Sequence, residues 1–249
     1  MAQSLFEEFE IHNYGAPLFK VAGHPIYFTN SALYMFITIT ASALLIILTM
    51  RPQALVPGRW QMLTESMHNL VNDMVMSSAG PHAKPYFPFI LTIFFFILFC
   101  NLFGLVPGTL AVTSHIIINL AIALLLFLVI IITGFVKNGF HFLALFAPAG
   151  VPKPVLPFMI LIELVSFLVR PFSLSVRLFA NMLAGHILLQ VFAGMIVSLL
   201  AAGWLAGLGI LPLLANIAMT GFEFFVACLQ AYIYTMLASV YLRDALEAH

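Results

Sequence analysis

Three ionisable residues interrupt one long apolar stretch of the sequence, residues 155–202, at intervals of seven. They are Glu163, Arg170 and Arg177, and Asn181 follows four residues after the last of them. On a helix of 3.6 residues per turn, this spacing keeps all four side chains along one stripe. Because ionisable groups are costly inside apolar membrane helices, such a stripe usually marks a pathway, an ion pair or a functional site.

A second polar stripe lies in the last apolar segment of the chain. Glu223 and Gln230 are also seven residues apart. If the chain reverses direction within residues 203–209, Gln230 comes to the depth of Arg177. Glu223 then comes to the depth of His186. The spacing therefore predicts two antiparallel helices that present a matched polar seam.

The chemistry of such a seam is proton transfer around a fixed charge. A guanidinium does not deprotonate in proteins, so Arg177 suits the role of a divider that attracts carboxylates and bars leakage. Along an ideal helix, Glu163 lies about 21 Å before Arg177 and His186 about 13 Å after it. Together with Glu223, the imidazole of His186 can exchange protons near neutral pH. The layout predicts two half-paths for protons, separated by Arg177.

The composition indicates what positions these residues. The chain is 63% hydrophobic and 7% charged, against about 25% charged residues in soluble domains. Apolar stretches of roughly 20 residues are long enough to cross a bilayer. We therefore predict an all-α membrane protein, a single membrane domain with about five membrane segments and an interfacial amphipathic helix. The predicted parts are an outer N-terminal segment (1–29), a first span (30–50), the interfacial helix (58–79), further spans (87–106 and 112–136) and two long tilted helices (155–202 and 211–243).

The long segment 155–202 exceeds one upright span, so it either breaks near Pro171 or lies strongly tilted. The positive-inside rule places the N-terminus outside and the C-terminus on the cytoplasmic or matrix side. Only Lys20 falls on the outer side, and the opposite side receives Arg51, Arg59, Lys84, Lys137, Lys153 and Arg243. A formal net charge of zero argues against a nucleic-acid partner.

The run from Ser173 to Met182, SLSVRLFANM, resembles the signature of subunit a of F-type ATP synthases. Glu163 before this run, Ala184-Gly185-His186 after it and Tyr241 in the closing segment agree with that family, and the resemblance covers nearly the whole chain. Many bacterial members have an acid at the position of His186 and a histidine at that of Glu223. The reversed pair resembles mitochondrial and alphaproteobacterial versions.

The resemblance implies a non-catalytic stator subunit whose two tilted helices form a hairpin against a ring of c subunits. Arg177 would face each ring carboxylate as it passes, between two proton half-channels. The residues implied for the outer half-channel are His186, Glu223, Gln230, His115 and Asn119. The inner half-channel would contain Glu163, and the supporting residues would be Asn181, Ser173, Tyr234 and Tyr241. His115 stands where many members carry an acid, so a purely structural role stays open for it.

The implied partners are the c-ring, the peripheral stalk subunit b, other ATP synthase subunits and membrane lipid, with protons as the transported ion. The implied location is a bacterial inner membrane or a mitochondrial inner membrane. No cofactor and no metal are expected. Sodium coupling stays open, although the pair of His186 and Glu223 favours protons.

Other interpretations of the same residues remain. In one alternative, Arg170 is a structural ion-pair partner, and Glu163 pairs with it without conducting protons. A self-contained secondary transporter would use Arg177 to bind an anionic substrate, but it calls for repeats that are not visible. An intramembrane hydrolase would use His186 and Glu223 around a metal, but the sequence lacks an HExxH motif.

Overall fold

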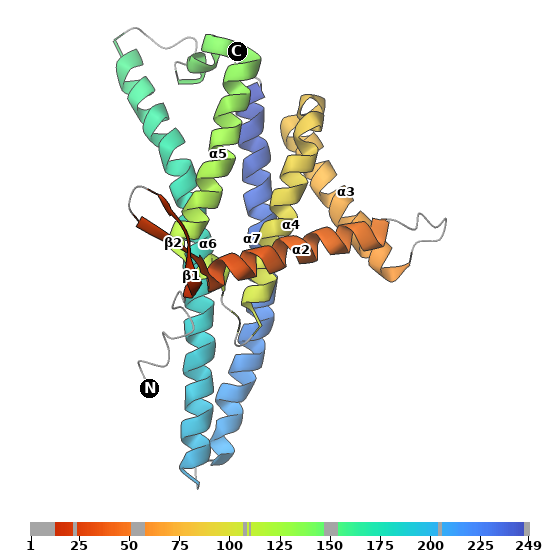
Figure 1. The fold of residues 1–249 in the computed structure, drawn as a ribbon, viewed down its shortest axis with the longest axis vertical. Coiled ribbons are helices and arrows are strands. Elements are labelled where there is room, and N and C mark those ends of the chain that lie inside the picture. Colours follow the sequence, from red (N-terminus) through yellow and green to blue (C-terminus); the bar gives the residue numbers. More distant parts are fainter. Residues whose placement is uncertain are drawn as a thin grey trace. The chain divides into compact units, whose positions relative to one another are not determined.

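A computed structural model describes residues 13–21, 24–50, 58–106, 109, 111–146, 154–203 and 206–246 (Figure 1). Its helices are α2 (Asn30–Met50), α3 (Arg59–Ala79), α4 (Phe87–Gly104), α5 (Ile116–Asn138), α6 (Leu156–Ala201) and α7 (Ile210–Leu246). Short 3-10 helices are η1 (Pro81–Tyr86), η2 (Val112–Ser114), η3 (Gly139–Phe146) and η4 (Ala206–Gly209). Residues 1–12 of the predicted outer segment lie outside the described residues, as do Arg51 and Lys153.

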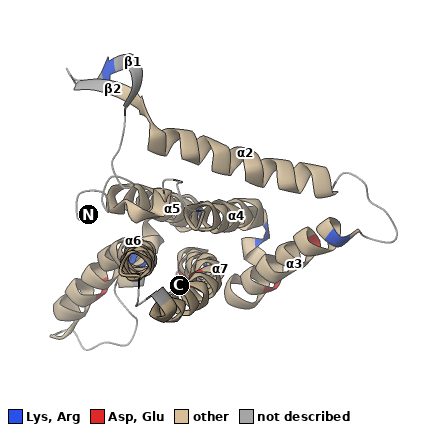
Figure 2. Cartoon of the chain, turned by 90° about the horizontal axis from the view of Figure 1, so that it is seen from below, with Lys and Arg blue, Asp and Glu red and all other residues tan. Residues whose placement is uncertain are grey.

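Five helices in the described part of the chain are long and apolar enough to cross a membrane, namely α2, α4, α5, α6 and α7. Figure 2 shows how little of the ribbon carries Lys, Arg, Asp or Glu. The remaining helix, α3, is amphipathic: Val71, Met74 and Val75 are buried, whereas Asn69 and Asp73 are exposed. The predicted all-α membrane protein, with about five membrane segments and one amphipathic helix, is confirmed.

A small β-hairpin precedes the first span, and the sequence prediction did not include it. Strands β1 (Asn13–Val21) and β2 (His24–Thr29) pair antiparallel, with an irregular register between Tyr14 and Phe19. The segment contains prolines, which are confined to edge strands and bulges. In a two-stranded sheet both strands are edges, so the prolines that weaken the strand signal are tolerated.

The chain divides into two compact units. The first comprises Met1–Leu44, Phe96–His115 and Leu178–Gln230, and the second comprises Leu45–Phe95, Ile116–Arg177 and Ala231–His249. The prediction of a single membrane domain stays a prediction. In the second unit, aromatic packing joins α5 to α6, since the rings of Phe127 and Phe167 lie 4.4 Å apart. Asn138 at the end of α5 donates a hydrogen bond of 2.7 Å to the carbonyl of Ala245 on α7.

Helix α6 passes through Pro171 without a break, which excludes one of the two alternatives that the sequence left open. Its 46 residues, at about 1.5 Å each, give roughly twice the length needed to cross a core of about 30 Å. A tilted course for α6 stays the prediction. The third span also differs from its predicted range, because the main helix begins at Ile116 rather than near residue 112. Ser114 donates a hydrogen bond of 2.6 Å to the Ala111 carbonyl, a local bond that competes with helix formation.

Candidate functional site

The carboxyl group of Glu223 lies at a close approach of α6 and α7 in the first unit. A Cβ atom added to Gly185 would stand 2.7 Å from Glu223 Cδ, so any larger residue at this position would force the Glu223 carboxyl group to move. Glu223 is 4% exposed. Among the described residues, neither of its carboxyl oxygens has a hydrogen-bond partner. A buried polar group without a partner is rare in folded proteins and invites a functional explanation.

A cavity of about 320 Å³ in the first unit contains His186 among its lining residues. Gln190 lies one turn further along α6, and Asn216 and Thr220 line the cavity from α7. None of these three was among the predicted site residues. Asn216 is seven residues before Glu223, so it lies on the predicted stripe of α7. Gln190 is four residues after His186 and shares the face of that histidine on α6.

A second, smaller cavity is lined by Glu223 and by three further polar residues of the first unit. Its volume is about 10 Å³, at the lower limit for a single water molecule. Gln230, Asn181 and Asn101 contribute to its lining. Asn101 of α4 is fully buried and donates a hydrogen bond of 3.4 Å to the carbonyl of Ala227. Thus α4 holds the turn of α7 that follows Glu223, a role that the sequence prediction missed.

The two residues predicted near the outer end of the third span occupy different units. His115 is half-buried and belongs to the first unit, whereas Asn119 of α5 is 1% exposed and belongs to the second. Neither residue lines the two cavities described above. Their participation in a proton path stays a prediction.

Arg177 is exposed on α6, and no ion pair joins it to any other described residue. The exposed face around it bears mostly small or polar side chains, namely Ser173, Val176, Ala180, Asn181 and Ala184. On the opposite face, Leu174, Leu178 and Met182 are buried. The permanent charge therefore stands on a face of α6 that the chain itself leaves open.

Arg170 has a different environment, in the second unit. Its Nη2 atom lies 3.5 Å from Glu163 Oε1, and its Nη1 atom donates a hydrogen bond of 3.1 Å to Asp244 Oδ2. The guanidinium carbon also lies 4.7 Å from the centre of the Tyr241 ring, within the range of a cation–π interaction. These contacts favour the ion-pair interpretation of Arg170. They also place Glu163 and Tyr241 in one cluster.

Asp244 was not predicted because it lies one residue beyond the predicted end of the closing segment. It is fourteen residues after Gln230, two seven-residue steps along the same stripe. Tyr234, between them, is 2% exposed, and its hydroxyl has no hydrogen-bond partner among the described residues. The last helix thus carries polar groups along most of its length.

Comparison with known proteins identifies the family. The family model described as ATP synthase A chain matches residues 32–243, which include every site residue named above except Asp244. The chain belongs to the ATP synthase A chain family. The resemblance predicted from the run Ser173 to Met182 is therefore confirmed.

Individual members of the family match over nearly their full length. ATP synthase subunit a of Pelagibacter ubique (strain HTCC1062) is 44% identical over 250 residues, which cover 100% of both chains. The protein of the same name from Maricaulis maris (strain MCS10) is 47% identical and covers 97% of this chain and 96% of its own. That from Methylobacterium sp. (strain 4-46) is 49% identical and covers 90% of each chain. Most of the similar family members are alphaproteobacterial. This agrees with the prediction from His186 and Glu223, whose arrangement resembles mitochondrial and alphaproteobacterial versions of subunit a.

Proposed function

We propose that the chain is the proton-translocating stator subunit of an ATP synthase membrane sector, non-catalytic in itself, which works beside a ring of c subunits. Membership of the ATP synthase A chain family supports the setting. The proposal rests on the observation that Arg177 is exposed on an apolar helix and makes no ion pair with the described residues. An arginine turned toward lipid is costly, so its side chain calls for a partner from another protein.

The surroundings of Arg177 fit a passing helix that carries a carboxyl group. Small side chains such as Ala180 and Ala184 let helices approach closely within a membrane. A carboxylate that meets Arg177 stays ionised beside the positive charge, and it must bind a proton before it re-enters lipid, where the charged form is far costlier. Arg177 thereby separates the site where protons bind the ring from the site where they leave it.

The first unit supplies the groups for an outer half-channel. The cavity beside His186 holds side chains that donate and accept hydrogen bonds, and Glu223 lies one helical turn beyond Thr220. The smaller cavity links Glu223 to Gln230 and Asn101. In the proposed path, water and the carboxyl group of Glu223 pass protons through this series toward the ring. His115 and Asn119 are the further residues that the family resemblance assigns to this half-channel.

The second unit supplies the groups for an inner half-channel. Glu163 and Asp244 both approach Arg170, and each carboxylate can accept a proton that the ring releases. Arg170 holds the two acids together through these contacts. The triad of Glu163, Arg170 and Asp244 is therefore proposed as the exit, with Tyr241 packed against it.

The same proposal sets the orientation and the neighbours. The N-terminus lies outside and the C-terminus in the cytoplasm or matrix, as the distribution of Lys and Arg predicts. Subunit b of the peripheral stalk and other synthase subunits hold the chain against the ring, and lipid covers the remaining apolar surface. The membrane is a bacterial or mitochondrial inner membrane.

Gly185→Ala is expected to slow proton flow by roughly tenfold, because the new methyl group displaces the Glu223 carboxyl group and overpacks the junction of α6 and α7. Proton pumping driven by ATP in inverted vesicles measures the effect. The matched control is Gly194→Ala on the same helix, where an added Cβ meets nothing within 4 Å. Equal pumping by both variants would show that the close approach at Gly185 does not matter.

Cysteine cross-linking tests the proposed partner. Ser173 is exposed on the face of Arg177, whereas Ser175 is buried with its hydroxyl bonded to the Phe172 carbonyl. In a background without Cys100 and Cys228, Ser173→Cys is expected to cross-link to cysteines introduced in the membrane helix of subunit c. Ser175→Cys, an equally small change, should not. Cross-linking of neither variant, in a complex that assembles, would contradict the proposal.

A further inference from the structure

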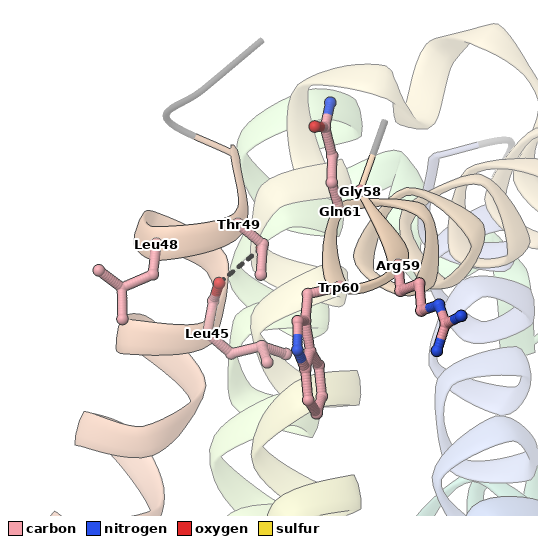
Figure 3. Close-up of a pocket in the computed structure, with 7 residues that line it drawn as sticks. All are labelled: Leu45, Leu48, Thr49, Gly58, Arg59, Trp60 and Gln61. Atoms are coloured by element: carbon pink, nitrogen blue, oxygen red, sulfur yellow. Dashed lines mark hydrogen bonds between the residues drawn. The ribbon is translucent and has the colours of Figure 1, made fainter. Parts of the chain in front are cut away.

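The end of α2 and the start of α3 enclose a cavity of about 530 Å³ that shares no residue with the proposed proton path (Figure 3). Leu45, Leu48 and Thr49 line it from α2, and Arg59, Trp60 and Gln61 line it from α3. Ligand pockets in proteins have volumes of about 300–1,000 Å³. All of these residues belong to the second unit.

A hydrogen bond fixes the two walls of this cavity. The hydroxyls of Thr49 on α2 and Thr64 on α3 lie 3.0 Å apart, and Thr64 is buried. Thr49 also bonds the carbonyl of Leu45 at 2.6 Å, which Figure 3 draws as a dashed line. A partly buried hydrogen bond between α2 and α3 therefore helps to hold the two walls of the cavity in place.

The side chains of the cavity match the two halves of an amphipathic molecule. Leu48 and Trp60 are 67% and 70% exposed, and Figure 3 shows the Trp60 ring beside Leu45. Arg59 is exposed and makes no ion pair with the described residues. The nearest acid in sequence, Glu65, accepts a hydrogen bond of 2.8 Å from Gln61.

Two of the polar groups beside the apolar wall, those of Arg59 and Trp60, are donors only. The Arg59 guanidinium and the Trp60 indole N–H donate hydrogen bonds and accept none, whereas a phosphodiester group only accepts them. Arginine binds phosphate oxygens through two parallel hydrogen bonds. Trp at the end of a membrane span is typical of the lipid headgroup level, and basic pockets between membrane helices on the cytoplasmic or matrix side bind anionic headgroups.

We propose that this cavity binds an anionic phospholipid. Arg59 and the Trp60 indole N–H hold the phosphate, and one acyl chain lies along Leu45 and Leu48. The bound lipid fills the space between the first span and the interfacial helix α3.

Tryptophan fluorescence tests the proposal directly. The sequence has two tryptophans, Trp60 and Trp204, so Trp204→Phe leaves Trp60 as the only reporter. The full chain is reconstituted in phosphatidylcholine vesicles, to which phosphatidylglycerol with brominated acyl chains is added in rising proportion. Half-maximal quenching is expected at a mole fraction about fivefold lower than for brominated phosphatidylcholine, a preference that one basic residue near the headgroups supplies.

Variants and salt separate a specific site from general contact with lipid. Arg59→Gln is expected to abolish the preference, whereas Lys137→Gln, which removes an exposed charge at the end of α5, should keep it. If Arg59→Gln does not fold, the unsubstituted residue is tested instead: high salt should weaken the preference for phosphatidylglycerol. Equal quenching by both lipids overturns the proposal. So does loss of quenching in the intact synthase, which would show that another subunit occupies the cavity.

Discussion

Replacing Arg177 with alanine is expected to abolish proton-driven ATP synthesis, with a loss of at least about 100-fold, while the synthase still assembles. The first half of this expectation follows from the divider role, because the other positive group on this stripe of α6, Arg170, is already paired with Glu163 and Asp244. The second half follows because Arg177 makes no ion pair with any described residue. Removing its guanidinium therefore deprives no described carboxylate of an ion-pair partner. ATP synthesis in energised vesicles and the amount of assembled complex measure the two halves.

Arg170→Ala provides the contrasting control. Both variants lose one positive charge from α6, but Arg170 has two carboxylate partners, Glu163 and Asp244. Its removal leaves those acids without compensation, which is strongly destabilising when groups are partly buried. We therefore expect Arg170→Ala to reduce the amount of assembled complex, and Arg177→Ala to reduce only its activity. Synthesis at half the normal rate or more in the Arg177→Ala complex would contradict the proposed function.

The main features of the fold were predictable because their signals are strong. Apolar runs of about 20 residues have few alternatives to membrane helices, and α2 begins and ends at the residues of the first predicted span. The spacing of Glu163, Arg170 and Arg177 predicted one stripe. In the structure, Arg170 pairs with carboxylates, whereas Arg177 makes no ion pair with the described residues. This difference depends on Asp244 of α7 and not on α6 alone.

Other site residues were missed because their signals are weak when taken singly. Asn101 is an isolated amide in an apolar run, and only packing against α7 gives it a partner at Ala227. Asn216 lies on the predicted stripe of α7 but carries no charge, so it did not stand out. Gly185, in contrast, belongs to a run of residues that indicated the family. Why a glycine stands there is clear only from the structure, in which it leaves room for the Glu223 carboxyl group.

The sequence left two courses open for α6, a break near Pro171 or one long tilted helix, and it could not decide between them. Proline removes one hydrogen bond and crowds the preceding turn, so a break is the usual outcome in an isolated helix. Here Pro171 is buried, and Phe167 in the preceding turn packs against Phe127 of α5. Tertiary packing of this kind outweighs the local preference of the proline.

Glu223→Gln is expected to slow proton conduction through the membrane sector by roughly 10- to 100-fold, the range by which a positioned proton-transfer group accelerates such steps. The amide preserves the size of the side chain, so the contact with Gly185 and the packing of α6 on α7 remain. What the variant loses is a group that can both bind and release a proton. Proton uptake into vesicles stripped of the catalytic sector, normalised to the amount of assembled complex, measures the effect.

Two further variants distinguish proton transfer from packing at Glu223. Glu223→Asp keeps an exchangeable proton on a shorter side chain, so it should conduct better than Glu223→Gln although it fits the site less well. Glu65→Gln removes a carboxylate that bonds Gln61 on α3, outside the proposed path, and should conduct normally. If Glu223→Gln conducts at more than half the normal rate in a fully assembled complex, protons reach the ring by another route. The cavity lined by Gln190, Asn216 and Thr220 would then have to deliver them without this carboxyl group.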